Sequence, residues 1–130
     1  MLIVSACLLG VRTRYDGGKL TIPDRLRRLI GEGECIIPVC PEQLGGLPTP
    51  RAKSLVRWIK DSPTVTNDRG KDVTVEFLKG AAEVLRIAET LGIKKAIFKS
   101  RSPSCGGEGV TTRLLRAQGI EVEVVDAEKE

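Results

Sequence analysis

The stretch KAIFKSRSPSCGGEGVTTRLLRAQGIEVEVV, residues 95–125, decides the fold class of this chain. Its apolar residues predict a strand over residues 95–99, a helix over about residues 111–118 and a last strand over residues 120–125. Two strands joined through one helix predict a parallel pair with a right-handed crossover. The loop between the first strand and the helix consists mostly of small residues.

The rest of the chain repeats this alternation of strand and helix. Residues 2–7 and 35–40 are apolar enough for two more strands, and a helix opened by Pro23 lies between them. The clearest helix covers residues 73–91, where apolar residues recur at helical spacing. We therefore expect an α/β fold, a parallel sheet with flanking helices, in one domain over residues 1–130.

The segment between the second strand and the long helix is less regular. Residues 41–51 are too rich in glycine and proline for regular structure, and long irregular loops in compact domains are usually functional. Residues 55–59 and 64–66 are expected to form short additional strands.

Composition excludes several classes of protein. Hydrophobic residues make up 41% of the chain and charged residues 29%, as in a soluble globular protein. The apolar opening has no basic flank and is typical of a first strand rather than a signal peptide, so we expect a cytoplasmic protein with no membrane segment. The net charge of +4 comes with only two Phe, one Trp and one Tyr, too few rings for a base-stacking surface, so there is no strong nucleic-acid signal.

Three of the four cysteines follow predicted strands. Cys7 closes the first strand, Cys40 closes the second, and Cys105 lies one short loop after the third. The carboxyl ends of parallel strands meet at the edge where α/β proteins bind ligands, so we expect these thiols to share a site. Cys35 stands at the opposite end of the strand that Cys40 closes, about 16 Å away, and is expected to pack in the core.

Cys105 lies in the segment Ser102-Pro103-Ser104-Cys105-Gly106-Gly107, just before a predicted helix. Backbone N–H groups in such a loop can point at one ligand, and a helix N-terminus adds partial positive charge. We therefore expect a lowered pKa for the Cys105 thiol. The thiolate that results is the form that binds metals or attacks electrophiles.

Three thiolates without any histidine leave several kinds of site open. Structural zinc needs four ligands, and Cys35 is too far away to be the fourth. A 4Fe-4S cluster on three cysteines keeps one iron free as a Lewis acid for a soft atom such as sulfur. A non-catalytic cluster- or zinc-binding module that senses redox state or carries sulfur is the alternative. A thiol enzyme with Cys105 as nucleophile would lack a histidine base.

Polar residues near the cysteines are candidates for catalysis and binding. Glu42 follows Cys40 by two residues and can act as general acid or base where histidine is absent, or remain an ordinary loop residue. Ser102 and Ser104 can orient a substrate heteroatom or cap the following backbone. Arg51 and Lys99 are candidates for binding an anion in the substrate, with surface solubility as the other interpretation.

Six sequence blocks occur in order along nearly the whole chain: Ala6-Cys7-Leu8-Leu9-Gly10, Arg14-Tyr15-Asp16-Gly17, Val39-Cys40-Pro41-Glu42 with Gly45-Gly46-Leu47, Pro50-Arg51, Gly70-Lys71-Asp72-Val73-Thr74, and Ser102-Pro103-Ser104-Cys105-Gly106. Together they resemble the thiouracil desulfidase family, long known only as a bacterial domain of unknown function.

This resemblance implies a Rossmann-like α/β fold and a 4Fe-4S cluster on Cys7, Cys40 and Cys105. It also implies non-redox removal of sulfur from a thiolated pyrimidine such as a thiouracil. In that reaction the substrate sulfur binds the free iron, water attacks the carbon, and sulfide leaves. The resemblance further implies that Glu42 acts as the general acid or base and that Ser102 positions the substrate.

Two loops differ from the usual family pattern. Gly107-Glu108 leads almost directly into Gly109-Val110-Thr111, where the family usually has an extended segment. Ala52-Lys53-Ser54 follows Pro50-Arg51, where many members have a glutamate a few residues on. Both loops are expected to face the ligand crevice, so the differences bear on the identity of the substrate more than on the cluster.

Overall fold

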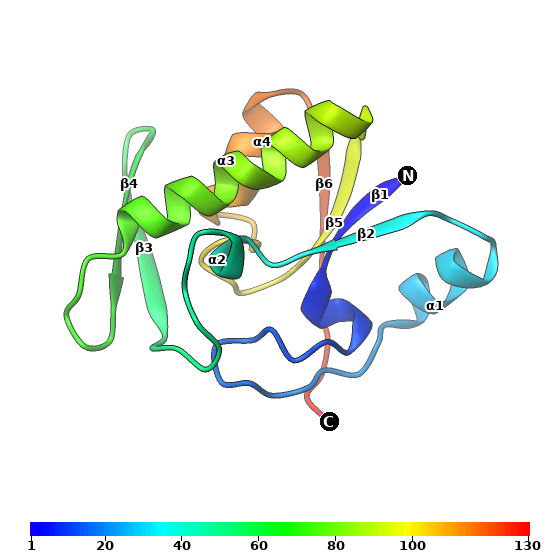
Figure 1. Cartoon of the computed structure of the whole chain (residues 1–130), viewed down its shortest axis with the longest axis horizontal. Helices are drawn as coiled ribbons and strands as arrows, with labels where there is room; N and C mark the ends of the chain where they lie inside the picture. The colour runs from blue at the N-terminus through cyan, green and yellow to red at the C-terminus, as the bar shows by residue number, and fades with distance from the viewer.

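The structure is a computed structural model that describes residues 1–130, with a fully parallel four-stranded sheet at its centre (Figure 1). The strand order is β2 (Ile36–Val39), β1 (Leu2–Ser5), β5 (Lys95–Lys99), β6 (Glu121–Val125). The α/β class and the parallel sheet that the sequence predicts are therefore confirmed.

Helices cover both faces of this sheet (Figure 1). The helices α3 (Thr74–Leu91) and α4 (Val110–Ala117) pack on one face, and α1 (Asp24–Gly31) packs on the other. The helix α3 starts one residue after the predicted position and ends where predicted. Its buried residues recur at helical spacing, so a single apolar stripe covers the sheet.

Consecutive residues of the two central strands point to opposite faces. Ile3 and Phe98 belong to the core under α3 and α4, whereas Val4 and Ile97 belong to the core under α1. All four side chains are completely buried. Burial on both faces explains why these strands are continuously apolar rather than alternating.

A separate antiparallel hairpin packs beside the amino-terminal half of α3 (Figure 1). It consists of β3 (Ser54–Ile59) and β4 (Ser62–Asn67). Val65 of β4 packs with Phe77 of α3 in a third core cluster. The two short strands that the sequence predicts in this region are confirmed.

Two segments are more ordered than the sequence predicts. Residues 41–51, expected to be irregular, begin with the helical turn α2 (Pro41–Leu44), because proline suits a first turn whose N–H needs no partner. The first strand ends at Ser5, and the chain continues in the 3-10 helix η1 (Ala6–Leu9). Cys7 therefore lies in this helical turn rather than at the end of the strand.

The short helix α2 lies directly against the backbone of α3. A Cβ atom on Gly80 would stand 1.9 Å from the Pro41 carbonyl oxygen, and one on Gly45 would stand 1.9 Å from the Glu76 carbonyl oxygen. Only glycine allows two backbones to approach this closely. The contact holds α2 in place at the end of β2.

Cys35 is exposed, so its predicted position in the core is wrong. The strand β2 is an edge strand and begins only at Ile36, after the turn that contains Gly33. Cys35 lies between this turn and the first residue of the strand.

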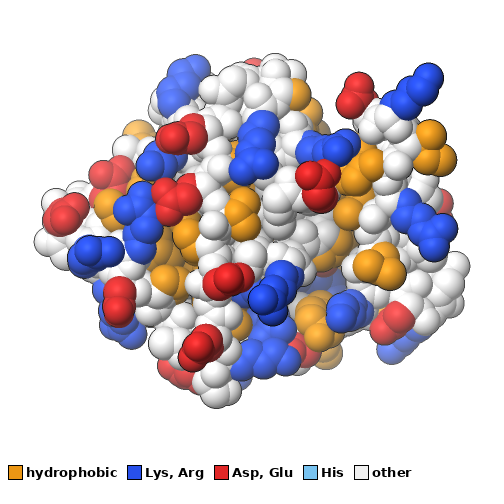
Figure 2. All heavy atoms as spheres, turned by 180° about the vertical axis from the view of Figure 1, so that it is seen from behind, with side chains coloured by type: hydrophobic (Ala, Val, Ile, Leu, Met, Phe, Trp, Pro, Cys, Tyr) orange, Lys and Arg blue, Asp and Glu red, His pale blue; other side chains and the backbone are white.

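Charges of both signs are interspersed over the face shown in Figure 2. The net charge of +4 therefore forms no single continuous basic stripe across that face. None of the helices combines the length and the apolar character needed to cross a membrane.

Candidate active site

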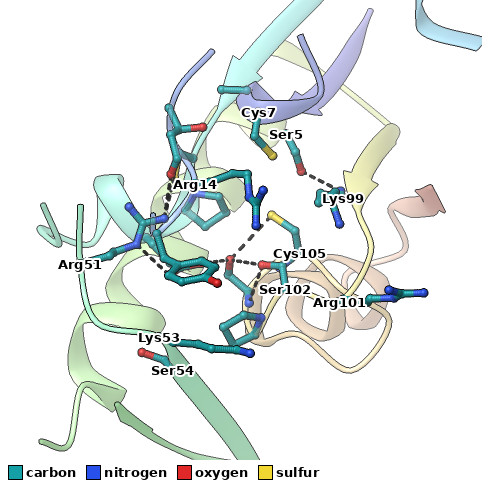
Figure 3. A pocket seen from close by; sticks show the side chains of 18 of the residues that line it. Ser5, Cys7, Arg14, Arg51, Lys53, Ser54, Lys99, Arg101, Ser102 and Cys105 are labelled. Atoms are coloured by element: carbon teal, nitrogen blue, oxygen red, sulfur yellow. Dashed lines mark hydrogen bonds and ion pairs between the residues drawn. The ribbon is translucent and has the colours of Figure 1, made fainter. Parts of the chain in front are cut away.

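A cavity of about 410 Å³ opens at the carboxyl end of the sheet (Figure 3). Its walls come from η1 and the loop that follows, from α2, from the start of β3 and from the loop after β5. The volume suits a small-molecule site. All eight residues that the sequence proposes for the site line this cavity: Cys7, Cys40, Glu42, Arg51, Lys99, Ser102, Ser104 and Cys105.

Cys105 is held in a tight loop that two glycines close. Ser102 Oγ accepts hydrogen bonds from the backbone N–H groups of Ser104 at 3.2 Å and of Cys105 at 3.0 Å. A Cβ on Gly106 would lie 2.7 Å from the Ser102 carbonyl oxygen, and one on Gly109 would lie 2.4 Å from the Ser104 carbonyl oxygen. The absence of these Cβ atoms lets the loop fold back on itself, and Cys105 becomes buried in the cavity wall.

Burial governs the protonation of two of the three thiols. It raises the pKa of Cys105 to about 12, and burial followed by the nearby Cys40 raises the pKa of Cys7 to about 11. The lowered pKa expected for Cys105 is therefore wrong. The helix α4 begins only at Val110, so the thiol lies in the preceding loop, and loss of water dominates. Metal binding must displace the protons of both thiols.

The three thiols are close enough to influence one another. The nearby Cys40 raises the pKa of Cys7, and the nearby Cys7 raises the pKa of Cys105. They follow β1, β2 and β5, which are adjacent strands with β1 in the middle. The topology therefore brings three sequence-distant cysteines to one cavity.

The donor set is the relevant test for a bound metal. No three Cys, Asp or Glu side chains are arranged around a single metal-ion position. Sulfur ligands of one zinc ion all lie about 2.3 Å from it, whereas the cysteines of a cubane cluster bind different irons and stand further apart. Three soft sulfur donors facing one cavity, with no imidazole, fit an iron–sulfur cluster.

Glu42 is buried and accepts hydrogen bonds on both oxygens. Its Oε1 accepts from Arg51 Nε at 3.0 Å, and its Oε2 accepts from Ser104 Oγ at 2.9 Å. Ser104 Oγ in turn lies 3.0 Å from Ser102 Oγ. Acceptance on both oxygens is the arrangement of an ionised carboxylate. Glu42 thus forms one end of a hydroxyl chain that runs along the cavity wall.

Every side-chain nitrogen of Arg51 donates a hydrogen bond to another group of the protein. Besides its bond to Glu42, Nη2 donates to the Thr13 carbonyl and Nη1 donates to Thr49 Oγ1, both at 2.8 Å. Its Nη2 also lies 3.9 Å from Cys40 Sγ. The anion that Arg51 binds is therefore Glu42, and the guanidinium connects this carboxylate to the thiol side of the cavity.

Lys99 ends β5 beside the thiols. Its Nζ donates to the Ser100 carbonyl at 2.9 Å, and its backbone N–H donates to Ser5 Oγ at 3.0 Å. Burial lowers the pKa of Lys99, and the nearby Cys7 acts in the opposite direction. Lys99 therefore contributes a partly buried positive charge close to Cys7.

Sequence reasoning does not identify Arg14 as part of the site. Arg14 lines the cavity, and its charge lowers the pKa of Cys7 against the larger effect of burial. The block Arg14-Tyr15-Asp16-Gly17 contributes to the family resemblance, so a signal is present. It lies in a loop without periodicity, however, and a loop sequence does not say where its side chains point. The other lining residues that were not predicted include Ser5, Lys53 and Arg101.

Fold and site together define a class of protein: a parallel α/β chain with three cysteines and a buried carboxylate around one cavity at the carboxyl edge. The chain matches the family model of 2-thiouracil desulfurase over residues 2–127. It therefore belongs to the 2-thiouracil desulfurase family.

Two known proteins match nearly the whole chain. The uncharacterized protein YbbK of Bacillus subtilis (strain 168) is 32% identical, with 94% of this chain and 93% of YbbK covered. The solved structure of the 4Fe-4S-dependent thiouracil desulfidase TudS is 41% identical, with a TM-score of 0.83, and the match covers 95% of this chain and 89% of TudS. The resemblance to thiouracil desulfidases is therefore confirmed.

Proposed function

We propose that this protein is a 4Fe-4S-dependent desulfidase that removes sulfur from a thiolated pyrimidine such as a thiouracil, without net oxidation or reduction. The observation that carries the proposal is the meeting of three cysteines from three loops with the buried Glu42 around one cavity. Family membership and the likeness to TudS support the cofactor and the substrate class. We place the activity in the cytoplasm, where cysteines stay reduced.

Cys7, Cys40 and Cys105 are the residues that would hold the cluster. When bound, the cluster supplies an iron without a protein ligand, which is a Lewis acid suited to a soft substrate sulfur. Cys35 is exposed at the far end of β2 and takes no part.

Glu42 takes up the proton of the attacking water. Exchange of sulfur for oxygen at a pyrimidine carbon forms a C–O bond from water and breaks the C–S bond, with sulfur leaving as sulfide. The water must lose its protons along the way, and Glu42 is the only carboxylate that lines the cavity. A positioned general base of this kind contributes about 10²- to 10⁴-fold to the rate.

Ser104 and Ser102 have separate roles in the proposed reaction. Ser104 donates its hydroxyl proton to Glu42, so it can relay a proton to the carboxylate. Ser102 Oγ already accepts two backbone N–H groups, which leaves its own proton for Ser104 or for a substrate heteroatom. This supports a substrate-positioning role for Ser102. Arg51 acts through Glu42 as a positioning residue.

The experiment is anaerobic reconstitution followed by incubation with 2-thiouracil and 4-thiouracil, without added reductant. The proposal predicts uracil and sulfide in equal amounts, produced only by protein that carries iron and sulfide in the cluster ratio. A cluster-loaded protein that releases no sulfide from any thiolated base or nucleoside would contradict it. That outcome would favour a redox sensor or a sulfur carrier.

A further inference from the structure

Arg14 has a buried hydrogen-bond donor that no protein group accepts. Its Nη1 is one of only two buried side-chain nitrogen or oxygen atoms without a partner in the structure. The side chain is 15% exposed. Buried polar atoms in native proteins nearly always have partners, so an unpaired guanidinium N–H beside a cavity indicates a ligand that accepts it.

Asp16 and Tyr15 contact the Arg14 guanidinium on one side, and the side chain points into the cavity. Arg14 Nη2 lies 3.4 Å from Asp16 Oδ2, and the Tyr15 ring lies 5.6 Å from the guanidinium carbon. Asp16 is fixed in turn by the backbone N–H of Gly18 at 2.8 Å and by Lys129 at 3.5 Å. One edge of the guanidinium is therefore used for anchoring, and Nη1 remains free.

The free donor belongs to the thiol side of the cavity. Figure 3 shows the Arg14 side chain extending into the space near Cys7 and Cys105. The positive charge of Arg14 acts on both Cys7 and Lys99, which places the three groups together. The proposed function assigns the hydrogen-bonded network of Glu42, Ser104 and Ser102 to the attacking water. The donor on the thiol side of the cavity therefore remains available for the leaving sulfur.

The other basic residues of the cavity do not offer the same group. Arg51 uses all of its nitrogens within the protein. Lys99 Nζ donates to the Ser100 carbonyl. Lys53 and Arg101 are exposed at the rim. Arg14 is thus the buried cation of this cavity with a donor left for a ligand.

We propose that Arg14 Nη1 binds the anionic sulfur that leaves the substrate, so that its ligand is hydrosulfide or the thiolate-like sulfur that precedes it. This inference rests on the proposed desulfidase function and adds a residue to it. Negative charge develops on sulfur as the C–S bond breaks, and a preorganised donor in a site shielded from water stabilises such charge at no reorganisation cost. Lys99 adds a second positive charge beside the same thiol.

The test is a hydrosulfide titration of the anaerobically reconstituted protein, followed by its visible spectrum. The variant is Arg14→Gln, and the matched control is Arg101→Gln, which makes the same change of charge at the exposed rim. We expect R14Q to bind hydrosulfide about 10- to 100-fold more weakly than the wild type, as for loss of a hydrogen bond to a charged group. We expect R101Q to stay within about twofold and both variants to retain full iron content.

An unchanged hydrosulfide affinity in R14Q at full iron content would overturn the inference, as would an equal loss in R101Q. If R14Q loses iron, R14K decides: several-fold weaker hydrosulfide binding supports the inference, because the planar fork is lost while the charge remains. Wild-type affinity in R14K contradicts it. The titration needs no turnover, so a loaded protein without desulfidase activity would refute the proposed function while still testing Arg14.

Discussion

Cys35 and Cys40 flank the same strand, β2, and have opposite environments. Cys40 lines the cavity, where its Sγ lies 3.7 Å from the Thr13 carbonyl and 3.9 Å from Arg51 Nη2. Cys35 stands at the amino end of the strand and is exposed. The direction of a strand, rather than the residue type, therefore decides which cysteine belongs to the site.

The carboxylates near these cysteines show the same contrast. Glu34 precedes Cys35, is partly exposed and pairs with the amino group of Met1 at 2.9 Å. Glu42 follows Cys40 and is buried between Arg51 and Ser104. One end of β2 is thus a solvated turn, and the other end carries the chemistry.

The largest expected effect separates the two cysteines. Replacing Cys40 with serine should abolish cluster binding, because a hard hydroxyl is a poor ligand for this soft site. The same change at Cys7 or Cys105 should do so as well. Cys35→Ser should retain the full cluster and change the free energy of unfolding by less than about 0.5 kcal/mol, as for an exposed residue. Iron and sulfide counts after anaerobic reconstitution measure the first effect. Full iron in any of the three cavity variants would remove that cysteine from the ligand set.

The next effect separates the two carboxylates. Glu42→Gln keeps the side-chain shape and removes the proton acceptor, so turnover should fall by about 10²- to 10⁴-fold while the cluster spectrum stays intact. The matched control, Glu34→Gln, should leave turnover unchanged. Steady-state sulfide release measures both variants. Equal rates for E42Q and the wild type would show that Glu42 only supports the structure.

A smaller effect concerns the contact that holds α2 in place. Gly80→Ala inserts a Cβ atom 1.9 Å from the Pro41 carbonyl oxygen, so we expect a loss of about 1–3 kcal/mol in the free energy of unfolding. Gly31, near the Cys35 end of β2, has no neighbouring atom within 4 Å of its Cβ position. Gly31→Ala should therefore be neutral or stabilise by up to about 1 kcal/mol through helix propensity. Urea unfolding measures both, and equal stabilities would contradict the close approach of α2 and α3.

A last expected effect is a pH dependence of the metal-free protein. Burial raises the pKa of Cys7 to about 11 and the pKa of Cys105 to about 12, from 9.0 for an ordinary thiol. At a pH between the ordinary thiol pKa of 9.0 and the raised values of about 11 and 12, the folded state retains protons that the unfolded chain has released. Raising the pH through this range therefore favours unfolding. This contribution is complete below pH 9.0 and is lost as the pH rises through about 11 to 12. Urea unfolding at increasing alkaline pH measures it. Cys105→Ser should show a shallower decline than the wild type, and an equally steep decline would contradict the assignment.

The positions of the strands and their parallel direction follow from local patterns, which is why the sequence predicts the sheet and the approximate positions of Cys7, Cys40 and Cys105. The apolar runs Leu2-Ile3-Val4 of β1 and Ala96-Ile97-Phe98 of β5 indicate burial on both faces, and parallel pairing follows from the helices between strands. That topology brings these three cysteines to the same edge of the sheet.

Other features depend on packing that a single sequence does not reveal. The exposure of Cys35 follows from the edge position of β2, and the raised pKa of Cys105 follows from a loop buried before α4 begins. The role of Arg51 as the partner of Glu42, and the free donor of Arg14, depend on where loop side chains point. Loop residues have no periodicity from which such directions could be predicted.

We propose that Cys7, Cys40 and Cys105 together hold one 4Fe-4S cluster. Diffraction from anaerobically reconstituted crystals at the iron absorption edge tests it most directly, because anomalous scattering locates iron independently of the protein. We predict one compact peak in the cavity, in contact with the Sγ atoms of all three cysteines and with one iron lacking a protein ligand. A single-ion peak, a peak that any of the three sulfurs fails to reach, or iron bound at Cys35 would contradict the account.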